Sequence, residues 1–195
     1  MSFVGGVGYS NIDLIYFGLD RLPDKGEEIF ARGFSMQFGG GIPATMINLS
    51  RLGVESRIIT FAGHDLFSEF VKKTLNSYPV KTVNLYKGNK MPVVLSSTLL
   101  YCGDRSFISY TDGMDLNDAV MDEVYENLKG AYVVDMHVGF LDVYKRLKKD
   151  GCIQIFDTGW EDDLTLEKYK DYLEIADYYI PNQKEAMKIT GTSSV

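Results

Sequence analysis

The chain has 195 residues, 45% hydrophobic and 24% charged, a composition typical of one globular domain with a sizeable core. Its net charge of −7 argues against a nucleic-acid backbone or an anionic membrane as partner. It shows neither a signal peptide nor the ~20 apolar residues of a membrane span, so we expect a cytoplasmic protein. Cys102 and Cys152 are expected to stay reduced, and His64 and His137, which lack neighbours at metal-ligand spacing, to be structural.

The pattern of apolar residues divides the chain into short strands and amphipathic helices. The first half predicts, in order, a buried strand at 2–7, strands at 12–18 and 29–38, a glycine loop with a helix ending at Gly53, a strand at 57–62 and a helix at 66–78. The second half predicts strands 93–102 and 106–110 joined by a turn at 103–105, a helix at 116–128, strands at 131–136, 152–156 and 178–180, and helices at 140–149 and 164–175.

The last part of this series alternates strictly between strands and helices. Such alternation forms βαβ units, so we expect an α/β fold with a doubly wound, mostly parallel sheet. The strands at 12–18, 29–38, 93–102 and 106–110 do not fit the alternation. We expect them to form a small second sheet, a lid inserted in the α/β core and placed over the carboxyl ends of the parallel strands, where such folds bind ligands.

The glycine segment at residues 38–53 is the strongest local signal for a site. Gly39, Gly40 and Gly41 leave the backbone unshielded, and a helix starts directly after them. A helix N-terminus offers unpaired N–H groups and the positive end of a dipole, which suit hydroxyl, carboxylate or phosphate groups. A flexible turn before a core helix explains the segment equally well. The spacing excludes a P-loop because no lysine follows the glycines.

Asp13 is the single charge in an apolar run. A carboxylate there either faces solvent at a strand end or binds a polar ligand, because an unpaired buried charge is costly. Both interpretations remain open from the residues alone.

Six segments in a fixed order carry a family resemblance: GYSNID, PDKGEE, FGGG with RLG, GHDLF, GDRSF and DYYIPNQKEAMKITG. Together they resemble the ribokinase-like (PfkB) family of carbohydrate kinases along essentially the whole chain. The resemblance implies a β-lid that closes on a sugar above an α/β core. It also implies transfer of a phosphoryl group from ATP to a sugar hydroxyl with Mg²⁺, and a possible homodimer formed through the lid.

The resemblance assigns the sugar contacts to the first quarter of the chain. Asn11 and Asp13 match the Asn-x-Asp pair that binds sugar hydroxyls, although an Asx turn would also explain them. Gly39, Gly40 and Gly41 match the diglycine whose N–H groups meet the sugar. The family then has an asparagine, and here that position holds Ala44 or Thr45, depending on how the motif is aligned. We assign Thr45 to the sugar site.

The resemblance assigns the nucleotide and metal contacts to the end of the chain. Asn182 and Glu185 match the Asn-x-x-Glu motif that organises Mg²⁺ and the phosphates of ATP, with Glu185 nearest the metal. The same two residues also fit a capping box that begins a helix after Pro181. Asp157, at the end of a core strand, matches either a family residue near the cleft or a cap of a βα turn.

The catalytic segment of the family is missing. Its general base lies in a Gly-Ala-Gly-Asp sequence, which occurs nowhere in residues 1–195. We therefore expect the front portion of a kinase domain, from a truncated chain or a shortened gene product, that is inactive alone because its base lies beyond Val195. One alternative is a non-catalytic relative that binds a sugar or a partner. A dinucleotide-binding oxidoreductase is disfavoured because Gly6-x-Gly8 lacks the third glycine.

Overall fold

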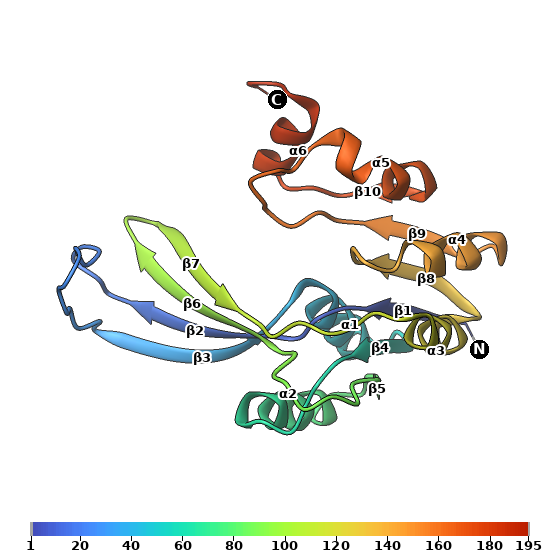
Figure 1. The fold of residues 1–195 in the computed structure, drawn as a ribbon, viewed down its shortest axis with the longest axis horizontal. Coiled ribbons are helices and arrows are strands. Elements are labelled where there is room, and N and C mark those ends of the chain that lie inside the picture. The colour runs from blue at the N-terminus through green and yellow to red at the C-terminus, as the bar shows by residue number, and fades with distance from the viewer. Residues whose placement is uncertain (1, 195) are drawn as a thin grey trace.

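A parallel sheet forms the centre of the molecule. The computed structural model describes residues 2–194, and within them six strands pair in the order β10-β9-β8-β1-β4-β5, all parallel (Figure 1). Their bounds are β1 Phe3–Val7, β4 Ser56–Thr60, β5 Lys81–Asn84, β8 Ala131–Met136, β9 Ile153–Phe156 and β10 Tyr178–Tyr179. The predicted doubly wound α/β fold is confirmed.

Helices cover both faces of this sheet. They are α1 Gly41–Arg51, α2 Leu66–Asn76, α3 Asp118–Leu128, α4 Leu141–Lys149, α5 Leu166–Ile175 and α6 Gln183–Thr190. Neighbouring residues of β4 point to opposite faces: Ile58 packs in the hydrophobic cluster of α1 and α2, and Ile59 in that of α3 and α4. Two apolar clusters on one sheet account for strands that are buried on both sides.

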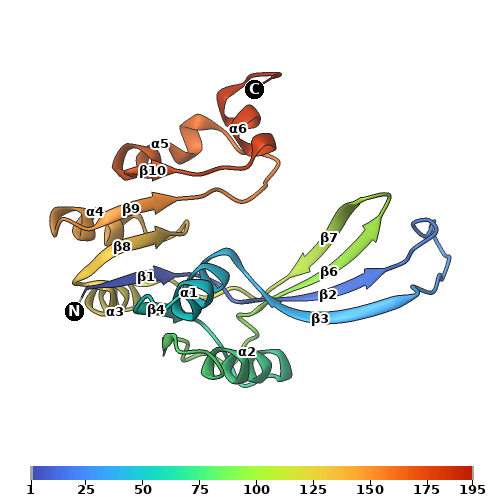
Figure 2. The same cartoon turned by 180° about the vertical axis from the view of Figure 1, so that it is seen from behind.

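A second sheet extends from the carboxyl ends of the parallel strands (Figures 1 and 2). This lid has the strand order β3-β2-β6-β7, with β2 parallel to β6 and the other pairs antiparallel. Its strands are β2 Asn11–Phe17, β3 Gly33–Gly39, β6 Val94–Tyr101 and β7 Asp104–Tyr110. The lid strands were therefore located correctly, with two local errors.

The first error is the strand at 29–38, which begins only at Gly33. The pairing of Phe17 with Gly33 ends the β2–β3 ladder, so residues 29–32 have no partner strand. The second error is the hairpin turn at 103–105. The turn consists of Cys102 and Gly103, which both have positive φ (51° and 78°), and Asp104 already belongs to β7. Such a two-residue turn matches the twist of the strands that it joins.

The two faces of the lid differ in chemistry. Residues that pair across the strands share a face, and one face is mainly polar, with Asn11, Asp13, Gln37, Ser96 and Ser109. The opposite face is mainly apolar, with Ile12, Leu14, Tyr16, Phe34, Met36, Leu99 and Ile108. Ile12 packs in the α1–α2 cluster, whereas Phe34 is 57% and Ile108 72% exposed. The lid is thus anchored at its inner end and has bare apolar surface at its outer end.

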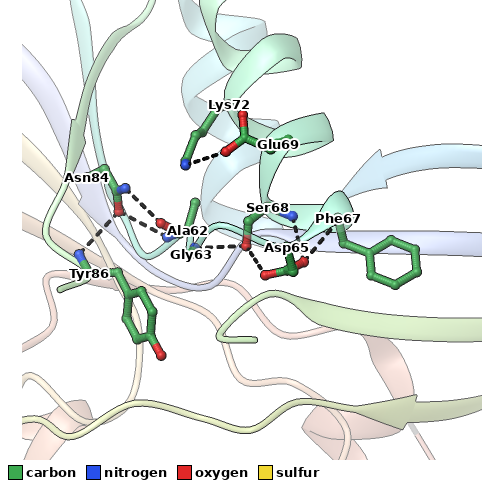
Figure 3. A network of polar contacts seen from close by, with 9 residues as sticks. All are labelled: Ala62, Gly63, Asp65, Phe67, Ser68, Glu69, Lys72, Asn84 and Tyr86. Carbon is green, nitrogen blue, oxygen red and sulfur yellow. Dashed lines mark hydrogen bonds and ion pairs between the residues drawn. The ribbon is translucent and has the colours of Figure 1, made fainter. Parts of the chain in front are cut away.

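A network of hydrogen bonds closes the turn between β4 and α2 (Figure 3). The Asp65 carboxylate accepts from the N–H groups of Phe67 and Ser68 (3.0 and 2.9 Å) and from the Ser68 hydroxyl (2.6 Å). The Asn84 amide pairs with both backbone groups of Ala62 (2.9 and 2.8 Å). Asp65 therefore caps α2, and Asn84 ties this turn to the end of β5.

Candidate functional site

The glycine loop ends in an uncapped helix. Gly40 is the N-cap of α1, with φ of 102° and no side-chain hydrogen bond to the helix. A Cβ atom on Gly40 would lie 2.9 Å from the carbonyl oxygen of Tyr9, so only glycine fits there. The first N–H groups of α1 have no partner within the helix itself. The helix therefore presents donors and the positive end of its dipole.

These donors face a cavity of about 340 Å³. In the sheet, the chain proceeds from β1 to β4 in one direction and to β8 in the other, so the strand order reverses between β1 and β8. Ligands bind at such a switch point, outside the carboxyl ends of the strands. The cavity is lined there by Tyr9, Asn11, Gly40, Gly41, Ile42, Thr45, Val94, Asp135, Met136, His137, Asp157, Thr158, Gly159 and Ile180.

Four of the six residues that the sequence assigns to the sugar line this cavity: Asn11, Gly40, Gly41 and Thr45. Asp13 and Gly39 lie just outside it, on the polar face of the lid. A Cβ atom on Gly39 would lie 2.5 Å from Oδ2 of Asp13 and 3.7 Å from Cβ of Asn11, so Asp13 occupies the space over this glycine. Partial burial raises the pKa of Asp13, and the charge of Arg105 opposes the rise.

The structure distinguishes the two alignments of the missing asparagine. Ala44 is exposed and does not line the cavity, whereas Thr45 does. The Thr45 hydroxyl donates to the carbonyl of Gly41 (3.1 Å) within the first turn of α1. The threonine hydroxyl therefore stands at the cavity wall.

Sequence reasoning missed Asp135, which lies near the end of β8 and lines the cavity. Burial raises the pKa of this carboxyl group to about 6, with the nearby charge of Asp157 adding to the rise and the Thr45 hydroxyl opposing it. Asp135 stands in the segment AYVVDM, a lone charge in a buried strand. That signal, which drew attention to Asp13, could have found Asp135 as well.

His137 was expected to be structural, and it lines the same cavity. Its Nδ1 atom lies 2.8 Å from the carbonyl oxygen of Val138, which can only accept, so Nδ1 carries the proton. Burial lowers the pKa of His137, which keeps the ring neutral at pH 7 and Nε2 an acceptor. The ring also packs edge-on against Tyr9, with centroids 5.7 Å apart.

Asn182 and Glu185 form the capping box that the sequence allowed. The Asn182 side chain accepts from the Glu185 N–H, and the Glu185 carboxylate accepts from the Asn182 N–H, both at 3.0 Å. Neither residue lines the cavity. Asp157 does, and its pKa is raised by partial burial and by the charge of Glu185, so these two carboxylates lie near each other. Within residues 2–194 no cluster of three or more His, Cys, Asp or Glu could hold a metal.

A larger hollow, of about 470 Å³, lies between the segments after β5 and before α3. None of the predicted site residues lines it, and its Lys87 is already paired with Glu123 (2.5 Å). It is a hollow of mixed charge that shares no lining residue with the cavity at the switch point. Across residues 2–194 no helix is long and apolar enough to cross a membrane.

The chain was compared with known families and structures. The profile of the pfkB family of carbohydrate kinases matches residues 1–195. The chain belongs to this family. The recognised resemblance and the ribokinase-like fold are thereby confirmed.

Individual pfkB relatives agree with this assignment. Deoxyribokinase of Salmonella typhi is 23% identical over 200 residues, which are 95% of this chain and 61% of the relative. Ribokinase of Arabidopsis thaliana, solved with ribose and ATP, has 23% identity and a TM-score of 0.79 over 98% of this chain and 64% of that one. Ribokinase of Giardia lamblia has 19% identity and a TM-score of 0.82; the match covers 100% of this chain and 61% of that one. The chain spans less than two thirds of the length of each of these relatives.

Proposed function

We propose that this chain carries the sugar-binding portion of a cytoplasmic carbohydrate kinase that uses ATP and Mg²⁺. The observation that carries the proposal is the cavity at the β1/β8 switch point, where the open N-terminus of α1 meets Asn11 from the lid. Family membership supplies the reaction class, phosphoryl transfer to a sugar.

The residues around the cavity would bind and orient the sugar. The Asn11 amide and the Asp13 carboxylate share the polar face of the lid, and together they offer an acceptor and a donor to adjacent hydroxyls. The free N–H groups of α1 stabilise partial negative charge on sugar oxygens. Holding the attacking hydroxyl in place is the main contribution that a protein makes to phosphoryl transfer.

The opposite side of the cavity suits a metal–nucleotide complex. Mg²⁺ takes one or two carboxylates, keeps several waters and binds phosphate oxygens. Glu185 and the nearby Asp157 supply oxygen ligands of this kind, and the charge of Glu185 is among the causes that raise the pKa of Asp157. Glu185 would hold the ion through water. When bound, Mg²⁺ and ATP supply the transferable phosphoryl group and neutralise its charge.

The general base is proposed to come from outside residues 1–195, which contain no Gly-Ala-Gly-Asp segment. The direct test measures sugar binding by calorimetry and sugar-dependent ADP release, on this chain and on the product of its complete gene. We expect binding by both and turnover by the second alone. Absence of sugar binding in both proteins would refute the proposal.

Replacement of Asp13 tests the sugar side. Asp13→Ala removes charge-assisted hydrogen bonds worth roughly 1.5–3 kcal/mol each, so sugar affinity should fall about tenfold or more. Asp171→Ala removes the same charge from an exposed position on α5 and serves as the control. Unfolding by urea should change little. Loss of folding with unchanged affinity in the folded fraction would make Asp13 structural.

A second candidate function is sugar binding without catalysis. It is favoured by the absence of the Gly-Ala-Gly-Asp segment and by threonine at the position of the family's asparagine. Calorimetric binding without any turnover in the complete gene product would select it.

The outer apolar face of the lid supports a homodimer. Phe34 and Met36 on one edge strand, β3, and Ile108 on the other, β7, are exposed there, and exposed sheets with such apolar residues are covered in stable proteins. We propose that the lid of a second copy packs on it. Analytical sedimentation of two variants tests this dimer. Ile108→Glu on the lid should yield monomer, whereas the matched change Val138→Glu, outside the lid, should not.

A further inference from the structure

Asp135 differs from the other acidic residues of the site because it lies inside the core sheet. It is part of β8 and lines the cavity together with Thr45 of α1 and Asp157, the residue after β9, both of which act on its carboxyl group. No lysine or arginine is among the residues that line the cavity, and no cation acts on Asp135 within residues 2–194.

A carboxylate with these neighbours makes little structural sense on its own. Structural carboxylates in protein interiors are paired with cations or accept several hydrogen bonds. Asp65 illustrates this, because three donors reach its two oxygens. The Thr45 hydroxyl lies near Asp135 but donates its hydrogen to the Gly41 carbonyl (3.1 Å), and the charge of the neighbouring Asp157 repels the Asp135 carboxylate. Its remaining acceptor capacity faces the cavity.

The charge of the whole cavity follows from its contributors. The N-terminus of α1 supplies roughly half a positive charge, and His137 is neutral at pH 7 because burial lowers its pKa. The negative charges are those of Asp135 and Asp157 in the cavity wall and of Asp13 on the lid. Arg105 acts on Asp13 from the outer strand of the lid and does not line the cavity. The wall is therefore net negative.

We propose that Asp135 contacts the sugar and makes this cavity select sugars without negative charge over those that carry a carboxylate or phosphate. This inference rests on the proposed sugar-binding function and names its substrate class. Hydroxyl hydrogens would satisfy the free lone pairs of Asp135. An anionic group in the same cavity would meet two carboxylates with no cation between them, a repulsion that discriminates strongly at low dielectric.

Calorimetry on the full chain with two matched pairs of sugars tests the inference: D-glucose with D-gluconate, and D-ribose with D-ribose 5-phosphate. The wild type should bind the neutral member of a pair about tenfold or more tightly. Asp135→Asn keeps the shape and removes the charge, so it should reduce this preference severalfold. Asp171→Asn, which makes the same change of net charge on exposed α5, should leave the preference unchanged.

Each result decides a separate point. Equal or tighter binding of gluconate or ribose 5-phosphate by the wild type would overturn the inference while leaving sugar binding intact. An unchanged preference in Asp135→Asn, with folding verified by circular dichroism, would show that Asp135 does not select. Binding of none of the four compounds would refute the proposed function, and the inference with it.

Discussion

Asp65 and Asp135 lie at the same edge of the parallel sheet and have opposite environments. Asp65 caps α2, and its hydrogen bonds to Ser68 and Phe67 outweigh burial, so its pKa is lowered. Asp135 faces a cavity beside an uncapped helix, and burial raises its pKa to about 6. The first carboxylate stabilises the fold, and the second costs stability that only a ligand can repay. The contrast distinguishes a structural carboxylate from one that we propose to bind a ligand.

The two helix N-termini continue this contrast. The first turn of α2 donates two N–H hydrogen bonds to the Asp65 carboxylate, whereas α1 begins at Gly40 without any side-chain cap. Replacing single residues at these positions tests the contrast.

The largest effect is expected at Gly40. Gly40→Ala forces a side chain into a backbone with φ of 102° and against the Tyr9 carbonyl at 2.9 Å. Strain of this kind costs about 3 kcal/mol or more of unfolding free energy. Gly41→Ala, where no atom lies within 4 Å of the added Cβ, should cost almost nothing. Urea denaturation of both variants measures the difference, and equal stability would contradict the open-cap description.

Asp135→Asn should stabilise the protein at pH 8 by about 3 kcal/mol at most. The raised pKa means that the folded state binds the proton more tightly than the unfolded chain. The stability associated with the protonated form is complete below pH 3.8 and is lost as the pH rises through about 6. Asparagine removes this loss, so the gain over wild type should appear between these pH values and remain constant above them. Thermal unfolding from pH 4 to 8 gives the profile, and a destabilised variant at pH 8 would make Asp135 structural.

Asp65→Ala should destabilise the protein by about 1–2 kcal/mol at pH 7, because the cap of α2 and the bond to Ser68 are both lost. Since the folded-state pKa of Asp65 is lowered, its contribution is present above the unfolded pKa and is lost as the pH falls through the folded value. The penalty should therefore shrink in acid. Asn117→Ala, at the singly bonded cap of α3, is an uncharged control whose smaller penalty should not vary with pH.

Most of the fold could be predicted from the sequence because its signals are local. Strand 131–136 has the predicted bounds, and Gly53, with φ of 82°, ends the first helix as expected. The short strand β5 was missed because only four residues, three of them polar, represent it. Residues 29–32 alternate like a strand, but pairing partners are a tertiary property.

The candidate site was predicted only in part for the same reason. Asn11 and the glycines follow a local motif. In contrast, Thr45 lines the cavity and Ala44 does not, and this depends on how α1 packs on the sheet. Ile42 fixes that position: it fills the space over Gly6 and Gly8, where added Cβ atoms would lie 2.5 and 2.9 Å from it. Asp135 reaches the site from a strand distant in sequence, and no local pattern joins the two.

The place of β1 in the sheet has a consequence for the folding rate. β1 pairs with β4 on one side, but on the other side Phe3 pairs with Ala131, after the whole lid and three helices have intervened. Pairing of segments so distant in sequence carries a large loop-closure cost and slows folding. The cavity straddles this pair, so its two walls meet only once the slowest contact of the sheet has formed. We therefore expect the candidate site to form late in folding.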